Sequence, residues 1–254
     1  SDAAAALAAV RPFGVRATVR RESIVEDAMD ALLALPADAL KGRVQIVFVN
    51  AAGGEEAGID GGGVFKEFMD CVTKAAFDPV RGDLFRATAE NALYAANDAP
   101  RAAESKHARL ARYEFCGRII AKALYESVLV EPRFARFFLN KALGKYNYFD
   151  DLRSLDGDLY RSLVALKRLP PAAVDDLGLA FEVTSTDARG SRSDVELAPA
   201  GRTTAVSAAN RSRYVQLLAH HRLNVETARP CGAFLRGLRA VIPQRWLRMF
   251  SPEE

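Results

Sequence analysis

Apolar residues recur every three or four positions along most of this chain, and this spacing constrains the fold more than any other feature of the sequence. Residues 24–35 show the pattern first, preceded by Ser23 and followed by Pro36. Glu26 stands three residues after Ser23, so the pair predicts a capping box, in which each side chain binds a free backbone amide at the start of a helix. The segment is therefore expected to be an amphipathic helix that ends before the proline.

The same spacing predicts helices over much of the remaining chain. Asp60 and the glycines at 61–63 come just ahead of the second helix, and no Gly-Lys-Ser/Thr sequence follows them. They indicate a turn with close backbone approach and not a phosphate-binding loop. The further helices are expected at about residues 65–76, 110–129, 134–143, 210–223 and 231–241, and residues 150–168 are expected to carry an acidic turn and another helix.

Strand-like segments are fewer. Residues 43–49 alternate in character and are rich in β-branched side chains, which is typical of a strand. Residues 179–184 and 194–197 also resemble strands, joined by a polar loop that contains glycine. Because these strands are not interleaved with helices as parallel crossovers would require, we expect an α+β protein that is predominantly helical.

Composition places the chain among ordinary globular proteins. Its 254 residues carry 35 lysines and arginines against 32 acids, for a formal net charge of +3, and 50% are hydrophobic. These values exclude a collagen-like repeat and a disordered tail. The most apolar stretch, residues 119–130, is too short to cross a bilayer and contains Lys122 and Glu126, so we expect no membrane span.

Basic residues concentrate in one part of the chain. Residues 201–250 contain nine arginines, no lysine and a single acid, Glu226. One interpretation is a nucleic-acid surface. The other is a set of solvated helix faces whose arginine stems cover apolar surface. We favour the second interpretation and do not expect nucleic acid as a partner, because no nucleic-acid motif and no interleaved aromatic residues accompany the charge.

Reactive side chains are scattered. The three histidines match no metal-binding motif and no cysteine pair has the spacing of zinc ligands, so we expect no metal and no cofactor. Cys71 and Cys116 lie among apolar residues of predicted helices, as core cysteines do, whereas Cys231 follows Pro230 near a helix start, where the pKa of a thiol can be lowered. An odd number of widely spaced cysteines favours a reducing compartment, and we expect a cytoplasmic location that can extend to the nucleus. The residues alone predict no self-contained active site.

Five segments, in order along the chain, resemble the signature sequences of the HECT-type ubiquitin ligases. They are residues 50–68 (NAAGGEEAGIDGGGVFKEF), 115–125 (FCGRIIAKALY), 143–146 (LGKY), 158–163 (DLYRSL) and 246–254 (WLRMFSPEE). Residues 57–66 are most similar to the branch of the family whose members carry an IQ-type calmodulin motif ahead of the domain.

The resemblance implies that residues 1–254 form the N-lobe of a HECT domain, divided into two subdomains. The larger, helical subdomain is expected to comprise about residues 1–131 together with 224–254. The smaller, α+β subdomain is expected at about residues 132–223. In this family the catalytic cysteine lies on a separate C-lobe in a Thr-Cys-Phe context, which none of the three cysteines shares. The resemblance therefore implies that the C-lobe is absent from these residues, and that this segment has no catalytic residue and is inactive alone.

The resemblance also implies a groove that binds the ubiquitin-conjugating enzyme. Eight residues match groove positions of the family: Leu159, Ser162, Leu163, Asp176, Leu177, Leu179, Tyr214 and Leu218. Leu159 and Leu163 form an i,i+4 pair on one predicted helix face, as Tyr214 and Leu218 do on another. Any one of these leucines is more often a core residue than an interface residue, and only the alignment with the family favours the interface.

Three departures from the family lie beside this groove. Leu218 stands where an aromatic residue is usual, and residues 169–173 (LPPAA) replace a loop that is usually acidic and contains glycine. His220-His221 replaces an Asp-Tyr pair that commonly precedes Arg-Leu-Asn. These differences bear on which conjugating enzyme the groove would accept.

The resemblance implies that the chain docks a ubiquitin-charged conjugating enzyme, so that ubiquitin passes to a cysteine on the C-lobe. The expected partners are a ubiquitin-conjugating enzyme, ubiquitin and, through other regions of the parent protein, protein substrates. One alternative is a non-catalytic interaction module derived from a HECT domain, which would bind a partner without transferring ubiquitin.

Overall fold

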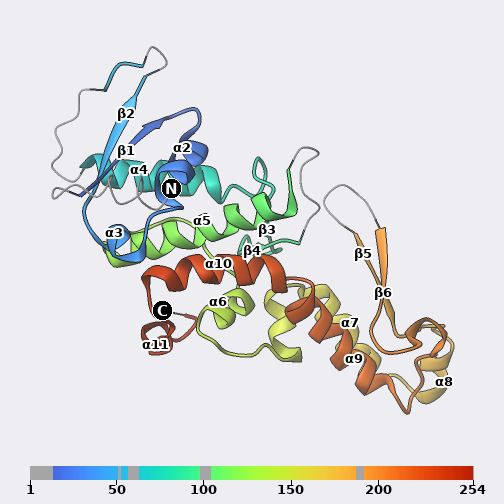
Figure 1. The fold of residues 1–254 in the computed structure, drawn as a ribbon. Coiled ribbons are helices and arrows are strands. Elements are labelled where there is room, and N and C mark those ends of the chain that lie inside the picture. The colour runs from blue at the N-terminus through green and yellow to red at the C-terminus, as the bar shows by residue number, and fades with distance from the viewer. Residues whose placement is uncertain (1–13, 51–52, 57–62, 98–103, 187–191, 254) are drawn as a thin grey trace.

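The structure is a computed structural model (Figure 1). It describes residues 14–50, 53–56, 63–97, 104–186 and 192–253. The turn expected at residues 60–63 falls almost wholly outside these ranges, and so do parts of the first signature segment and of the loop between the last two strands.

Two long helices, α5 (Lys106–Tyr125) and α10 (Ala228–Val241), lie side by side at the centre of the molecule (Figure 1). Their backbones touch where each helix presents a glycine. A Cβ atom on Gly117 would overlap the carbonyl oxygen of Phe234, and one on Gly237 would overlap the carbonyl oxygen of Glu114. Since any larger residue would push the helices apart, this crossing depends on glycine at both positions.

Aromatic side chains fill the space beside this crossing. The ring of Phe234 on α10 lies 5.1 Å from that of Phe138, 5.8 Å from that of Phe134 and 6.2 Å from that of Phe85, measured between centroids. Phe138 belongs to α6 (Arg136–Ala142), and Phe85 to the antiparallel pair of β3 (Phe85–Ala87) and β4 (Leu93–Ala95). The central helices are thereby joined to a short hairpin that the sequence analysis did not predict.

The N-terminal part contains a parallel pair of strands, β1 (Val15–Arg20) and β2 (Val44–Val49), in which Val15 lies opposite Val44. Between them the chain forms α2 (Ile24–Leu32) and α3 (Ala37–Lys41), and α4 (Gly63–Ala76) packs against α2 and β2 (Figure 1). The strand expected at 43–49 is confirmed. The expectation that no strands are joined by a parallel crossover is wrong, because β1, an alternating run with buried valines, was overlooked.

The start of α2 also differs from the expectation. The Ser23 side chain makes no capping hydrogen bond, so the predicted capping box with Glu26 is wrong. The Ser23 hydroxyl instead donates to Asp27 at 3.2 Å, and Asp27 accepts from the backbone amide of Arg20 at 2.8 Å and from its Nε at 2.9 Å. A carboxylate one turn into the helix thus ties α2 to the end of β1.

The C-terminal half carries the remaining elements (Figure 1). They are η1 (Phe149–Ser154), α7 (Gly157–Arg168), α8 (Pro171–Asp175), β5 (Glu182–Thr186), β6 (Arg192–Glu196), η2 (Gly201–Thr203), α9 (Arg211–His220), the π-helical segment η3 (His221–Val225) and α11 (Gln244–Leu247). Strands β5 and β6 pair antiparallel, which confirms the two predicted strands. The acidic turn and the helix expected within residues 150–168 correspond to η1 and α7, which are separate because Asp156 caps a new helix by accepting from the Leu159 amide at 2.9 Å.

These elements confirm an α+β fold that is predominantly helical. Buried hydrophobic residues from β1 through α10 belong to one connected core. The division into two subdomains, with boundaries near residues 131 and 223, stays a prediction. Among the described residues, no helix combines the length and the apolarity needed to cross a bilayer.

We expect alanine at Gly117 or Gly237 to lower the free energy of unfolding by at least about 2 kcal/mol, because the new methyl group would overlap the backbone of the facing helix. Urea unfolding of each variant measures the change. Gly232→Ala is the matched control, since this glycine also lies in α10 but a Cβ there would meet nothing within 4 Å. The control should be neutral or slightly stabilising, because alanine favours a helix more than glycine does.

Candidate functional site

Helices α7 and α9 pack against each other and carry most of the predicted groove residues. Three of the eight lie in the hydrophobic core: the exposed fraction is 4% for Leu163, 7% for Tyr214 and 5% for Leu218. The Tyr214 ring meets the ring of Phe181 edge-on, with 5.5 Å between centroids, and burial raises the pKa of the Tyr214 hydroxyl. These side chains hold the two helices together and form the layer beneath the surface.

The other five predicted residues reach that surface to different degrees. Leu159 and Leu179 are half-buried against the core, whereas Ser162 and Asp176 are exposed. Leu177, in the turn after α8, is 49% exposed although its side chain is apolar. The structure thus separates the predicted set into a buried base and an exposed rim, and the use of this surface for binding stays a prediction.

The proline pair that departs from the family lies at the junction of α7 and α8, with Pro170 between the two helices and Pro171 as the first residue of α8. Arg211, at the start of α9, donates from Nη1 to the carbonyl oxygen of Leu166 at 3.5 Å and to that of Leu169. This contact was not predicted from the sequence, because Arg211 follows Pro171 by 40 positions and no local pattern relates the two.

The other end of α9 is fixed by contacts to residues 146 and 147. The Tyr146 hydroxyl lies 2.6 Å from Nδ1 of His220, and the Asn224 amide nitrogen lies 3.3 Å from the same atom. Asn224 also donates to the carbonyl oxygen of Asn147 at 3.0 Å. His220, noted in the sequence as a departure from the family, is therefore an anchoring residue for α9.

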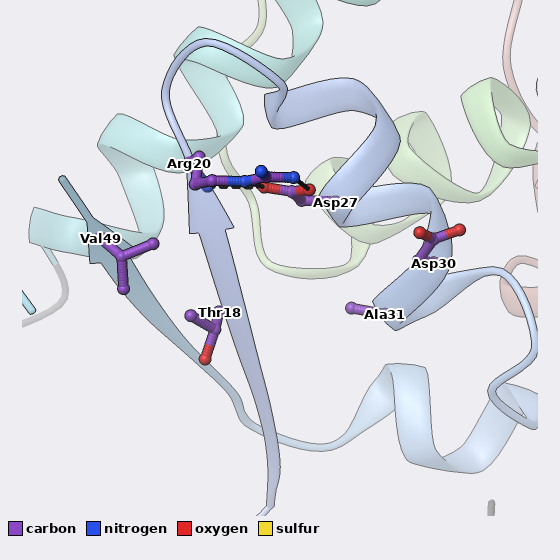
Figure 2. A pocket seen from close by; sticks show the side chains of 6 residues that line it. All are labelled: Thr18, Arg20, Asp27, Asp30, Ala31 and Val49. Carbon is purple, nitrogen blue, oxygen red and sulfur yellow. Dashed lines mark hydrogen bonds and ion pairs between the residues drawn. The ribbon is translucent and has the colours of Figure 1, made fainter. Parts of the chain in front are cut away.

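A separate open pocket lies beside β1 and α2, far along the chain from this surface. Its lining residues are Thr18, Arg20, Asp27, Asp30, Ala31 and Val49 (Figure 2). Figure 2 shows the Arg20 and Asp27 side chains lying against each other, and the arginine lowers the pKa of Asp27 to about 2. Arg20 and Asp27 therefore neutralise each other, and the residues that line this pocket include no cysteine or histidine.

The three cysteines do not form a reactive centre. Burial raises the pKa of the Cys116 thiol to about 12 and also raises that of Cys231, while Cys71 is half-buried. The expectation that the pKa of Cys231 would be lowered is wrong, because desolvation outweighs the nearby Lys141 charge and the hydrogen bond to Thr227. Within the described part of the chain, no three His, Cys, Asp or Glu side chains gather as metal ligands.

Several arginines of the basic stretch are engaged within the protein. Arg236 contacts Glu114 at 3.3 Å, Arg222 contacts Glu226 at 2.7 Å, and Arg202 contacts Glu182 at 3.2 Å. Arg239 donates to the carbonyl oxygen of Lys141 at 3.2 Å. These contacts support the interpretation of this stretch as helix faces and caps.

The surface built on α7 and α9 belongs to the part of the chain that a family model covers. The HECT-domain (ubiquitin-transferase) model matches residues 70–254. The chain belongs to this family. Four of the five signature segments lie within the matched residues, and the first lies ahead of them.

Relatives named as ubiquitin ligases extend the similarity to nearly the whole chain. E3 ubiquitin-protein ligase UPL6 of Arabidopsis thaliana is 41% identical over 239 residues, which are 94% of this chain and 23% of the relative. Ubiquitin-protein ligase E3B of Homo sapiens is 36% identical over 250 residues, 96% of this chain and 23% of the relative. E3 ubiquitin-protein ligase HUL5 of Saccharomyces cerevisiae is 34% identical over 244 residues, 94% of this chain and 26% of the relative. The chain thus spans about a quarter of the length of these ligases.

We expect Leu163→Ala and Tyr214→Ala to lower the free energy of unfolding by about 2–5 kcal/mol, because each leaves a cavity between α7 and α9. Leu177→Ala should change it by less than about 0.5 kcal/mol, since that side chain is already half in water. Urea unfolding of the three variants tests the division into base and rim. Equal destabilisation by all three would contradict it.

We expect iodoacetamide at pH 8 to alkylate Cys71 before the other two cysteines. The raised pKa values keep the Cys116 and Cys231 thiols protonated at this pH, and both side chains are buried. Mass spectrometry of peptides after a short exposure measures the order of labelling. Unfolding in urea is the control, because it should make all three thiols react at similar rates. Early labelling of Cys231 would show that its thiolate is accessible.

Proposed function

We propose that this chain docks a ubiquitin-charged conjugating enzyme for a HECT-type ubiquitin ligase. The observation that carries the proposal is the packing of α7 against α9, in which Leu163 and Tyr214 are buried, while Leu177, in the turn after α8, is exposed. Membership of the HECT family supports the presence of such a surface, and the family's known chemistry supplies ubiquitin as the transferred group.

The exposed part of this surface suits a contact of limited strength. An aromatic or aliphatic side chain from the conjugating enzyme would lie against Leu177 and the half-buried Leu159 and Leu179, with Ser162 and Asp176 at the edge. Such a small apolar centre with a polar rim gives specific but weak binding. Weak binding suits repeated ubiquitin transfer, because a conjugating enzyme that has given up its ubiquitin must leave before a charged one can replace it.

The chemistry of transfer belongs to a cysteine outside these residues. A thiolate attacks the thioester carbonyl of ubiquitin, the new thioester forms, and the conjugating enzyme leaves as its own thiolate. Cys116 and Cys231 are unsuited to this step, since burial raises their pKa values. We propose that this chain positions the donor and that further regions of the parent protein supply the acceptor cysteine and bind protein substrates, in the cytoplasm.

The second candidate is a non-catalytic interaction module, which would bind a partner without taking part in transfer. It differs from the first in what it predicts for a conjugating enzyme. The proposed function requires the chain to bind one, and the module does not. A titration with a panel of conjugating enzymes therefore distinguishes the two.

We expect Leu177→Asp to weaken binding of a conjugating enzyme at least about tenfold, because it places a charge at the apolar centre of the contact. Isothermal titration calorimetry measures the affinity, and the melting temperature should stay unchanged. Val80→Asp is the matched control, since Val80 is 89% exposed and lies in the turn after α4. Equal affinity of both variants would remove this surface as the binding site, and no binding by the unsubstituted chain would favour the module.

A further inference from the structure

Helix α7 ends in a sequence that cannot complete its own hydrogen bonds. The last four carbonyl groups of any helix lack partners within the helix, and the amides of the residues that follow often satisfy them. Here Leu169 is followed by Pro170 and Pro171, neither of which has an amide hydrogen. Of these three residues, only Leu169 donates a backbone hydrogen bond to the helix, from its amide to the carbonyl oxygen of Leu166 at 3.4 Å.

Arg211, on α9, supplies hydrogen-bond donors to the C-terminal end of α7. Its Nη1 donates to the carbonyl oxygens of both Leu166 and Leu169, and its side chain is half-buried between α7 and α9. A guanidinium charge at a helix C-terminus is also attracted by the partial negative charge of the last carbonyl groups. One residue of α9 thus replaces the donors that the two prolines remove from α7.

The segment from this point to Leu177 is short and hydrogen-bonded throughout. The Val174 amide donates to the carbonyl oxygen of Pro170 at 3.3 Å, and the Leu177 amide donates to that of Val174 at 3.3 Å. The Val174 side chain is fully buried. A displacement at Leu169 therefore moves α8 and the exposed leucine that follows it.

We infer that Arg211 is the positioning residue of the docking surface, which fixes the end of α7 against the start of α9 and so sets where Leu177 stands. The inference rests on the proposed function. Arg211 acts through the backbone of α7 and does not need to touch the conjugating enzyme. Arginine suits this role because its planar guanidinium presents donors in fixed directions, whereas the ammonium of lysine keeps the charge but rotates its donors on a flexible stem.

The test uses the 254-residue chain and three variants. Arg211→Met keeps the apolar stem and removes every donor, and Arg211→Lys keeps the charge. Arg236→Met is the matched control, because Arg236 is an exposed helical arginine whose partner, Glu114, lies in the central helix pair. For each variant we would measure the affinity for the conjugating enzyme, the melting temperature, and the hydrogen-exchange rates of the Leu169, Val174 and Leu177 amides.

We expect Arg211→Met to bind about tenfold more weakly, with faster exchange at the three amides, unchanged exchange in α5 and α10, and a melting temperature within a few degrees of the unsubstituted chain. Arg211→Lys should recover part of both the affinity and the protection. The control should match the unsubstituted chain in every measurement.

Three results would overturn the inference. Unchanged affinity in Arg211→Met would show that the surface does not depend on this residue. Weaker binding without faster exchange would show that Arg211 touches the partner directly. Loss of folding in both Arg211 variants would make it a residue of global stability. If the unsubstituted chain does not bind, the proposed function fails, and the exchange rates still show whether Arg211 holds the end of α7.

Discussion

The contact between α5 and α10 is the constraint on which the rest of the structure depends. Because Gly117 and Gly237 let the two backbones touch, the side chains on either side of the crossing meet closely enough to form one core. Phe234 connects that crossing to α6 and to the β3–β4 hairpin. The chain passes from α9 through η3 into α10, so the helix that carries part of the proposed docking surface leads directly into the central pair.

Periodicity predicted most of the helices, since an amphipathic stripe is a local property of the sequence. It could not predict the glycine contact, because Gly117 and Gly237 are 120 positions apart and each alone suggests only a weak point in a helix. The β1 strand was overlooked although Val15, Ala17 and Val19 alternate with exposed residues. Its parallel partner lies beyond two helices, and pairing at that distance leaves no local signal.

For the predicted groove, the sequence placed two i,i+4 pairs on separate helices, as the structure has them on α7 and α9, but it did not show which side chains are covered. Leu159 and Leu163 share a face of α7, yet only Leu163 is fully buried. Burial depends on what packs over each turn, and the elements that pack against α7 are η1 and α9. The contacts of Arg211 and His220 are likewise tertiary, since each joins two segments that no spacing rule relates.

The π-helical segment η3 sits between the helix of the docking surface and the helix of the central pair. A π-turn adds a residue to the backbone ladder, and each residue of a helix corresponds to a rotation of about 100°. The apolar stripe of α9 is therefore out of phase with that of α10, so that α9 packs against α7 while α10 packs against α5. This phase shift lets two differently oriented surfaces follow one another along the backbone, separated only by η3 and the turn at residues 226 and 227.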